Sequence, residues 1–186
     1  PNGRICVVAI KVRDTGGSRF YYIVETHSDD GGESWSSAAQ IASLNTSTSK
    51  KVAICFDSDN NLHIVCDVDE ERVFYGRLTS GGVADVPEEI SASGYEEQRT
   101  PDIAFCKSRG IIIVVWRGKP PLTWERVLLY RVGTVSTTGV NWESAREVPG
   151  TKQYYYADCP SCTFSGSRFC VVWVGPDDIG YRDIFA

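Results

Sequence analysis

The feature of this sequence that most constrains its fold is a repeated strand–turn–strand unit. Short apolar runs occur in pairs, and each pair is separated by a turn rich in Gly, Asn, Ser or Asp. One pair lies at residues 52–56 and 62–66, and the next lies at residues 102–106 and 111–116. Runs of β-branched and aromatic residues of this length are typical of strands, and helical periodicity is almost missing. We therefore expect an all-β fold built from tandem copies of one antiparallel unit.

The same unit recurs at both ends of the chain, where it is incomplete. A third pair lies at residues 158–164 and 169–173, whereas the run 4–9 matches only the second strand of a pair. Within each unit, a further strand rich in Tyr and Val follows the paired runs, at residues 20–25, 72–77, 126–132 and 181–185. A polar turn and a short fourth strand complete the unit. The expected strand count is three, four, four and three, in units spanning about residues 1–49, 50–98, 99–153 and 154–186.

The net charge, the length of the apolar runs and the first residues argue against several classes of protein. The net charge is −5 over 186 residues, which argues against nucleic acid as a partner because phosphate binding needs a basic face. No apolar run approaches the roughly 20 residues of a membrane-spanning helix. The sequence begins with Pro1, contains no Met and shows no secretory leader. We therefore expect a processed chain or a stretch of a longer protein.

The most specific motif lies in the turn between the last two strands of the first unit. Ser28, Asp30, Gly32 and Trp35 follow the spacing Ser-x-Asp-x-Gly-x-x-Trp. Hydroxyl and carboxylate oxygens in turns accept hydrogen bonds from nearby backbone N–H groups, and Gly adopts a positive φ at little cost. The Trp is expected to fold back and bury its ring against the sheet. The motif therefore predicts a structural turn with an anchor rather than a catalytic site.

This spacing resembles the Asp-box, or BNR repeat, of sialidase-like β-propellers. Weaker copies occur where the repeat places them: Thr137, Gly139 and Trp142 keep the glycine and the tryptophan, and Gly82 keeps the glycine alone. The resemblance implies a β-propeller of four-stranded antiparallel blades, of which about three and a half are present, with the boxes on the face away from the ligand. Because six blades are usual in this family, we interpret the chain as part of a larger propeller. Its open blade edges are available for pairing with another chain.

Seven cysteines are distributed over the units. If residues 60–61 form a two-residue turn, Cys55 lies directly opposite Cys66, and a similar hairpin places Cys162 opposite Cys170. The Cβ atoms of directly opposed residues are near disulfide distance. Two interpretations remain open, namely cross-strand disulfides and buried thiols that act as small apolar side chains.

In a propeller, one face carries the loops that enter the innermost strands and the loops that join the second strand to the third. This loop face usually holds the ligand, because aromatic rings there stack on sugars and charged groups bind hydroxyls or a sugar carboxylate. The candidate ligand-binding residues are Asp67, Asp69, Tyr95, Glu96, Arg99, Arg117, Trp124, Tyr155 and Asp177. Glu97 lies on the same loop as Glu96. A second interpretation of Tyr155 is that it packs between blades.

The family also includes active sialidases, which bind the substrate carboxylate with three arginines. They use a tyrosine nucleophile activated by a glutamate, and an aspartate as acid and base. The segment Gln98-Arg99-Thr100-Pro101 is similar to the Arg-Ile-Pro motif of the family at its arginine and proline, so Arg99 is the candidate catalytic residue. No second arginine matches a motif, and Arg117 is placed by position alone. A complete catalytic set is therefore not visible in the sequence.

The preferred interpretation is a non-catalytic recognition module of a secreted or cell-surface protein, which binds a glycan or a protein on its loop face. One alternative is a sialidase-type glycoside hydrolase with part of its active site outside this chain. Another is an architectural repeat in a larger assembly. No cofactor is expected. No metal is expected either, because Cys159, Cys162 and Cys170 lack the fourth ligand of a structural zinc site.

Overall fold

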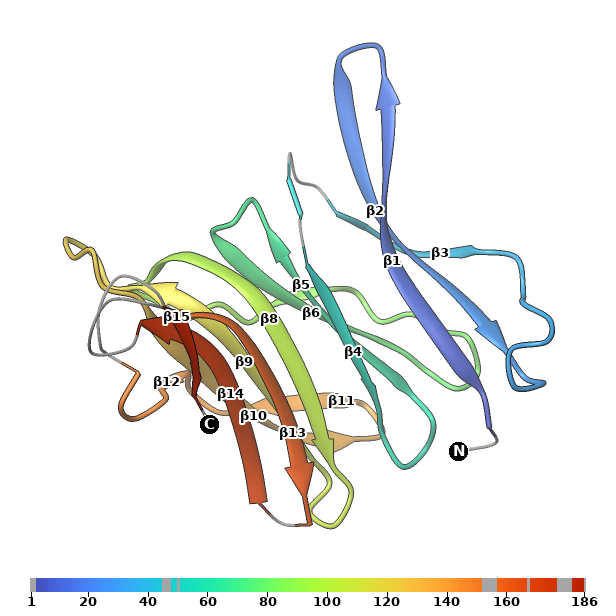
Figure 1. Ribbon diagram of the computed structural model, residues 1–186. Helices are drawn as coiled ribbons and strands as arrows, with labels where there is room; N and C mark the ends of the chain where they lie inside the picture. Colours follow the sequence, from blue (N-terminus) through green and yellow to red (C-terminus); the bar gives the residue numbers. More distant parts are fainter. Residues whose placement is uncertain are drawn as a thin grey trace.

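The chain folds entirely into β-strands and connecting turns. The computed structural model describes residues 3–44, 48–49, 51–151, 157–166, 168–176 and 182–185. The strands in these ranges form four antiparallel sheets, which follow one another along the chain (Figure 1). No helix that could cross a membrane occurs within the described residues. The prediction of an all-β fold is confirmed.

The four sheets occur in the order of the repeated units, but the third sheet begins at Glu96, before the expected boundary at residue 98. The first sheet contains β1 (Ile5–Thr15), β2 (Ser18–Ser28) and β3 (Ala39–Leu44). The second contains β4 (Val52–Phe56), β5 (Leu62–Val68), β6 (Arg72–Leu78) and β7 (Glu88–Glu89). The third contains β8 (Glu96–Cys106), β9 (Ile111–Lys119) and β10 (Val127–Ser136), with β11 (Gly139–Trp142) and β12 (Arg146–Glu147) both paired to β10. The fourth contains β13 (Asp158–Ser165), β14 (Arg168–Pro176) and β15 (Arg182–Phe185). The expected strand count differs in the third sheet, where the outer strand is divided in two.

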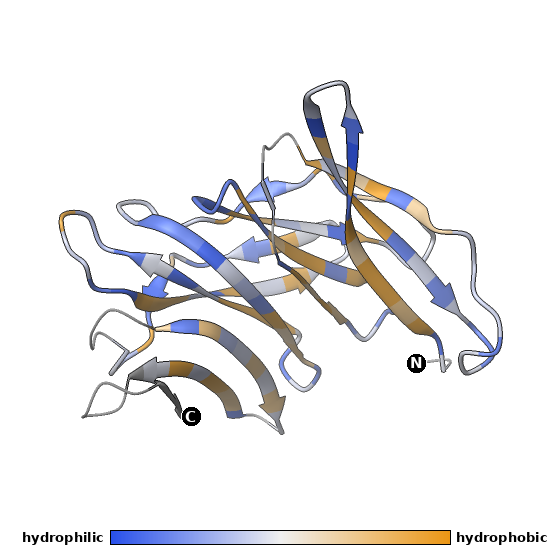
Figure 2. Cartoon of the chain, turned by 45° about the horizontal axis from the view of Figure 1, so that its top comes forward, coloured by the Kyte–Doolittle hydropathy of each residue, from blue (hydrophilic) through white to orange (hydrophobic). Residues whose placement is uncertain are grey.

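The sheets stand side by side in chain order, and their first strands lie close together. The strand β8 packs against β4 on one side and β13 on the other, while the first and fourth sheets occupy opposite ends of the row (Figure 1). Apolar cores fill the interfaces, and hydrophobic residues follow the strands that face each other (Figure 2). Ile112, Val114 and Trp116 of β9 are fully buried. Burial of an aliphatic side chain such as Ile112 or Val114 contributes roughly 1.5–3 kcal/mol to the free energy of folding. These apolar interfaces therefore hold the sheets together.

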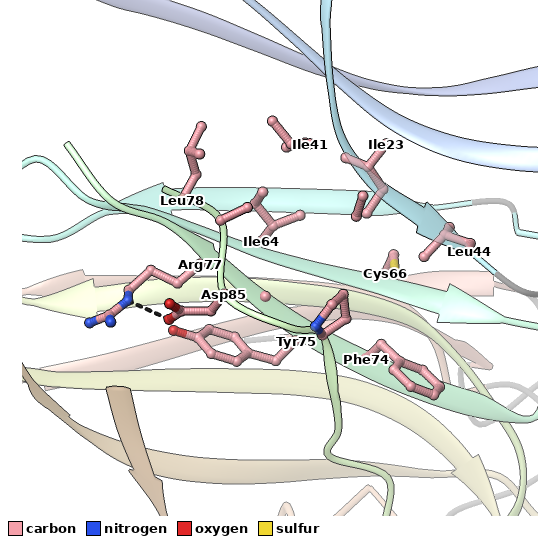
Figure 3. A pocket seen from close by; sticks show the side chains of 14 residues that line it. Ile23, Ile41, Leu44, Ile64, Cys66, Phe74, Tyr75, Arg77, Leu78 and Asp85 are labelled. Atoms are coloured by element: carbon pink, nitrogen blue, oxygen red, sulfur yellow. Dashed lines mark hydrogen bonds and ion pairs between the residues drawn. The ribbon is translucent and has the colours of Figure 1, made fainter. Parts of the chain in front are cut away.

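The interface between the first and second sheets contains one small void (Figure 3). Its volume is about 20 Å³, and it is lined by apolar side chains that include Ile23 and Leu44 of the first sheet and Ile64 of the second. Beside it, Arg77 Nε donates to Asp85 Oδ2 at 2.7 Å (Figure 3). A volume of this size holds about one water molecule. It is a packing defect and not a ligand site.

The turn that contains Ser28, Asp30, Gly32 and Trp35 is held by its own side chains. Ser28 Oγ accepts the N–H of Gly32 at 2.7 Å, and Asp30 Oδ1 accepts the N–H of Ser34 at 2.9 Å. Gly32 has a φ of 100°, a conformation that favours glycine. However, Trp35 is 45% exposed. The prediction that its ring is buried against the sheet is wrong.

Trp142 of the third sheet, which the sequence repeat aligns with Trp35, packs differently. Its Nε1 donates to Glu88 Oε1 at 2.7 Å, and its ring meets the ring of Tyr75 edge-on at 5.0 Å between centroids. Both partners belong to the second sheet, so Trp142 anchors its sheet to the preceding one. No sheet precedes the first among the described residues, which leaves Trp35 without a surface to pack on.

Of the two interpretations of Cys55 and Cys66, the structure shows free thiols and not a disulfide, because the register of the hairpin differs from the expected one. Cys55 lies opposite His63, and Cys66 lies opposite Val52. The turn spans residues 57–61 rather than two residues, and the two cysteines consequently lie on opposite faces of the second sheet. They pack into different apolar cores.

The predicted disulfide between Cys162 and Cys170 is also absent, for a related reason. Cys162 lies opposite Val171, and Cys170 lies opposite Thr163. A shift of one residue moves a side chain to the other face of a sheet. None of the seven cysteines, all of which lie within the described residues, forms a disulfide.

The carboxylate of Asp57 builds the longer turn. Its Oδ1 accepts the N–H groups of Asp59 and Asn61 at 2.8 and 2.9 Å, and its Oδ2 accepts Nε2–H of His63 at 3.1 Å. The buried His63 accepts the hydroxyl of Tyr75 at Nδ1 over 2.7 Å. Burial lowers the pKa of His63, so the ring is neutral. Burial also acts to raise the pKa of Asp57, but its hydrogen bonds outweigh burial and hold that pKa below the ordinary value.

Candidate ligand-binding site

Three arginines come together where the third sheet meets its neighbours on the loop face. Arg99 lies in β8, Arg117 in β9, and Arg126 directly before β10. The strand register places Arg99 directly opposite Arg117. Two like charges in that position repel each other and destabilise the strand pair. The arrangement therefore requires negative charge between the guanidinium groups.

A single carboxylate, that of Glu97, lies among all three arginines. Its Oε2 accepts hydrogen bonds from Arg99 Nη2 at 2.7 Å and from Arg126 Nη2 at 3.1 Å, and it lies 3.9 Å from Arg117 Nη2. Partial burial acts to raise the pKa of Glu97, but the hydrogen bonds from Arg99 and Arg126 hold that pKa below its ordinary value. Glu97 is therefore ionised. We call Arg99, Arg117 and Arg126 the arginine cluster.

Two further carboxylates hold the cluster from neighbouring sheets. Asp158 at the start of β13 lies 2.9 Å from Arg117 Nη1, and Glu70 in the β5–β6 turn pairs with Arg99. The Arg117 side chain is only 5% exposed. Within the described residues, its Nε and Nη2 atoms have no hydrogen-bond partner. The most buried guanidinium of the cluster thus keeps donor capacity that the chain does not use.

The backbone of β8 is irregular where it carries this site. Glu97 and Thr100 have positive φ values of 46° and 54°, and the register with β9 shifts on both sides of Arg99. Between them, the buried side chain of Gln98 accepts the N–H of Ala92 at 2.7 Å and the indole N–H of Trp116 at 3.0 Å. Strained backbone of this kind concentrates at functional sites. Here it accompanies the placement of the Glu97 carboxylate beside Arg99 and Arg126.

An exposed aromatic ring lies beside the cluster. The ring of Trp124, in the loop between β9 and β10, is 76% exposed. Lys119 Nζ lies 5.8 Å from the centre of this ring, 3.3 Å from Glu96 Oε2 and 3.6 Å from Glu97 Oε1. Lys119 thus connects an exposed indole to the carboxylate at the centre of the cluster.

The other predicted candidates occupy different places. Asp69 lies next to Glu70 but pairs with Arg72 at 3.3 Å. Asp67 is 1% exposed and accepts the N–H of Lys51 at 2.9 Å, which positions the start of β4. Tyr155 and Asp177 fall outside the described residues. Of the nine candidates, Glu96, Arg99, Arg117 and Trp124 are the ones that the structure brings together.

Tyr95 takes part in a tyrosine–glutamate pair, but its chemistry is not that of a nucleophile. Its hydroxyl donates to Glu147 Oε1 at 2.7 Å. Burial, together with this carboxylate, raises the pKa of Tyr95 to about 12. A nucleophilic tyrosine needs the opposite shift, because the phenolate is the reactive form. The ring packs against the core between the second and third sheets.

Sequence reasoning missed Arg126, Glu70 and Asp158. Arg126 was expected to begin a strand, and Glu70 is a turn residue with a φ of 59°. The available signal was that Arg126 directly follows the segment that carries the candidates Arg117 and Trp124. Asp158 offered no comparable signal, since its contact with Arg117 joins two different sheets.

A second hollow lies at the other end of the first and second sheets. It is a cleft of about 690 Å³ whose lining includes Arg4, Asp29, Glu25 and His27. These groups are already paired: Arg4 Nε lies 2.6 Å from Asp29 Oδ1, and His27 Nδ1 lies 2.9 Å from Glu25 Oε1. The arginine and the histidine of this cleft are thus already engaged by carboxylates. Within the described residues, no group of His, Cys, Asp and Glu side chains is arranged to hold a metal ion.

No protein-family model matches the sequence, and no curated protein matches it. Several solved structures, by contrast, have a similar fold. A protein of unknown function from Dyadobacter fermentans has a TM-score of 0.66 at 14% identity, covering 98% of this chain and 49% of that protein. The NanB sialidase of Streptococcus pneumoniae has a TM-score of 0.56 at 15% identity, covering 92% of this chain and 30% of the sialidase. An endo-arabinase of Bacteroides thetaiotaomicron has a TM-score of 0.51 at 12% identity, covering 95% of this chain and 73% of the arabinase. The fold of this chain is therefore similar to that of β-propeller enzymes, among them a sialidase and an arabinase.

The propeller fold does not settle what the chain does. This chain spans about half the length of the Dyadobacter fermentans protein and less than a third of NanB. At identities of 15% or less, the likeness concerns the fold, and many functions share one fold. The function has to be argued from the residues of the loop face.

Proposed function

We propose that this chain is a non-catalytic glycan-recognition segment of a secreted or cell-surface protein, and that its arginine cluster binds the carboxylate of an acidic sugar. The observation that carries this proposal is the convergence of Arg99, Arg117 and Arg126 on one carboxylate oxygen of Glu97. Guanidinium groups match the geometry of a carboxylate with paired donors. The same groups are suited to a sialic acid carboxylate, and NanB, whose fold is similar, is a sialidase.

The surroundings of the cluster support a sugar as the bearer of the carboxylate. Trp124 offers a flat apolar surface that is largely open to solvent. Aromatic rings of this kind pack on the apolar faces of sugar rings. The neighbouring Lys119 supplies a donor for ring hydroxyl groups. A single acidic sugar would thus pack its ring on Trp124 and place its carboxylate in the arginine cluster.

A sialidase-type glycoside hydrolase is the second candidate, because the arginine cluster is also what the family resemblance implies for such an enzyme. Within the described residues, the pair of Tyr95 and Glu147 offers such an enzyme no activated nucleophile, because burial and Glu147 raise the pKa of Tyr95 to about 12. The proposal therefore predicts binding without turnover. Hydrolysis of a fluorogenic sialoside by the protein would favour the enzyme instead.

We further propose that the four sheets are consecutive blades of a larger propeller, with boundaries near residues 49, 98 and 153. Ile5, Val7 and Trp35 on the first sheet are between 42% and 47% exposed, and exposed apolar side chains of this size are typical of surfaces that pair with another element. A further sheet, or another chain, would cover them. A structure of a longer form of the protein tests this, since the same side chains remain in solvent if the proposal is wrong.

Calorimetric titration with sialyllactose and lactose tests the binding function. The protein should bind sialyllactose and show no measurable heat with lactose. Arg126→Ala removes one charge-assisted hydrogen bond, worth about 1.5–3 kcal/mol, and should weaken binding tenfold or more. The matched control is Arg146→Ala, because Arg146 is exposed and pairs with Glu143 outside the cluster. Equal affinity for lactose, or an unchanged affinity in Arg126→Ala, would contradict the proposal.

A further inference from the structure

The centre of the arginine cluster is occupied by a group of the protein itself. Glu97 Oε2 is the shared acceptor for Arg99 and Arg126, and it is the carboxylate oxygen between Arg99 and the opposing Arg117. An incoming carboxylate needs the same donors. A ligand and Glu97 therefore compete for one position.

Glu97 satisfies the cluster incompletely. The distance of 3.9 Å to Arg117 Nη2 is that of an ion pair and too long for a hydrogen bond. Arg117 Nε, Arg117 Nη2 and Arg99 Nε have no hydrogen-bond partner within the described residues. A carboxylate that is not tethered to β8 is free to orient both of its oxygens toward these donors. Glu97 is thus a weaker acceptor for these arginines than a carboxylate of a ligand would be.

The backbone that carries Glu97 is held in an unfavourable conformation. A left-handed φ such as the 46° of Glu97 is disfavoured for a residue with a side chain by roughly 1–2 kcal/mol. The conformation is held by the arginine contacts and by Glu71, whose Oε2 accepts the N–H of Glu97 at 3.0 Å. When its carboxylate leaves the cluster, part of the force that holds this conformation is lost, which favours movement of the segment.

We propose that Glu97 is an internal stand-in for the carboxylate of the ligand, which occupies the arginine cluster in the free protein and leaves it when the ligand binds. This inference rests on the proposed function and adds how the same site selects its ligands. A neutral sugar cannot replace the charge of Glu97 among three guanidinium groups. Glu97 consequently lowers the affinity for every ligand and excludes those without an anionic group.

The variant Glu97→Gln tests the proposal in a titration with sialyllactose. The substitution keeps the size of the side chain and removes its charge, so a ligand should bind about tenfold more tightly than to the unaltered protein. Glu70→Gln is the matched control, because Glu70 also pairs with Arg99, whereas Glu97 Oε2 is the acceptor shared by Arg99 and Arg126. Glu70→Gln should not produce the same gain.

Three results would overturn the inference. Equal tightening by Glu97→Gln and Glu70→Gln would assign the effect to net charge. Weaker or unchanged binding by a folded Glu97→Gln would show that Glu97 positions the arginines for the ligand. Absence of carboxylate binding in both the unaltered protein and the variant would remove the proposed function together with this inference, whereas the first two results leave the proposed function intact.

A measurement on the unaltered protein keeps the test independent of how the variant folds. The hydrogen bonds from Arg99 and Arg126 hold the pKa of Glu97 below its ordinary value in the free protein. Saturation with sialyllactose should move that pKa upward toward the ordinary value, as followed by carboxyl-carbon NMR, because the ligand takes both donors. A pKa that stays low in the complex would contradict displacement.

Discussion

The side chain of Asp57 shows how one residue sets the register of two strands. The segment 57–61 contains several residues that favour turns, and the sequence alone does not choose among their possible turns. The choice is made by the Asp57 carboxylate, which accepts the N–H groups of Asp59 and Asn61. The resulting five-residue turn separates Cys55 from Cys66. Cross-strand arithmetic failed here because it depended on a turn length that side-chain hydrogen bonds decide.

Asp57→Asn should therefore lower the free energy of unfolding by about 1–3 kcal/mol at neutral pH, because it weakens the acceptors of a buried network. The folded-state pKa of Asp57 lies below its ordinary value of 3.8. The stabilisation by the carboxylate is thus complete above that value and is lost as the pH falls through the folded-state pKa. Urea unfolding at several pH values measures the difference between protein and variant, which should shrink in acid.

The control for this experiment is Asp59→Asn. Asp59 belongs to the same turn but is exposed and offers its backbone N–H to Asp57. It should leave stability nearly unchanged. A difference for Asp57→Asn that does not depend on pH would contradict the role given to the ionised carboxylate.

Among the elements, the strand β8 has one part that the sequence predicts and another part that it does not. Its regular part was expected at residues 102–106, and the structure extends it to Glu96–Cys106 through two register shifts. Apolar alternation identifies the regular part, whereas the irregular part depends on Gln98 contacting Ala92 and Trp116. Such contacts join residues distant in sequence. For the same reason, Arg99 and Arg117 were candidates from position, but their meeting with Arg126 was not foreseen.

A substitution at Gly133 of β10 tests how closely this strand packs against the side chains of β11. A Cβ atom at Gly133 would lie 2.3 Å from a methyl group of Val140 and 2.8 Å from the ring of Trp142. Gly133→Ala should displace that ring from Tyr75 and Glu88, and lower the free energy of unfolding by about 1–3 kcal/mol. Chemical denaturation measures the change.

Gly76→Ala is the matched substitution, because a Cβ atom at Gly76 meets nothing within 4 Å. It should cause no loss of stability and should slightly stabilise the strand. Equal destabilisation by the two variants would mean that contact with Trp142 is not what excludes a side chain at Gly133.

At the scale of the whole molecule, the repeat in the sequence predicts the order of the sheets well. Paired apolar runs with turns between them give each sheet its first strands, since both depend on local pattern. The burial of Trp35 was predicted wrongly, because it depends on a neighbouring sheet and not on the turn itself. The loop face could likewise be located from topology, while the contacts of Glu97 with the arginine cluster required coordinates.

A crystal structure of the protein with sialyllactose would show whether the ligand carboxylate takes the place of Glu97. We expect density for that carboxylate within hydrogen-bond distance of Arg99, Arg117 and Arg126, the sugar ring against Trp124, and the side chain of Glu97 moved out of the cluster. Density in the cleft near Arg4 and Glu25, with the contacts of Glu97 unchanged, would contradict this expectation.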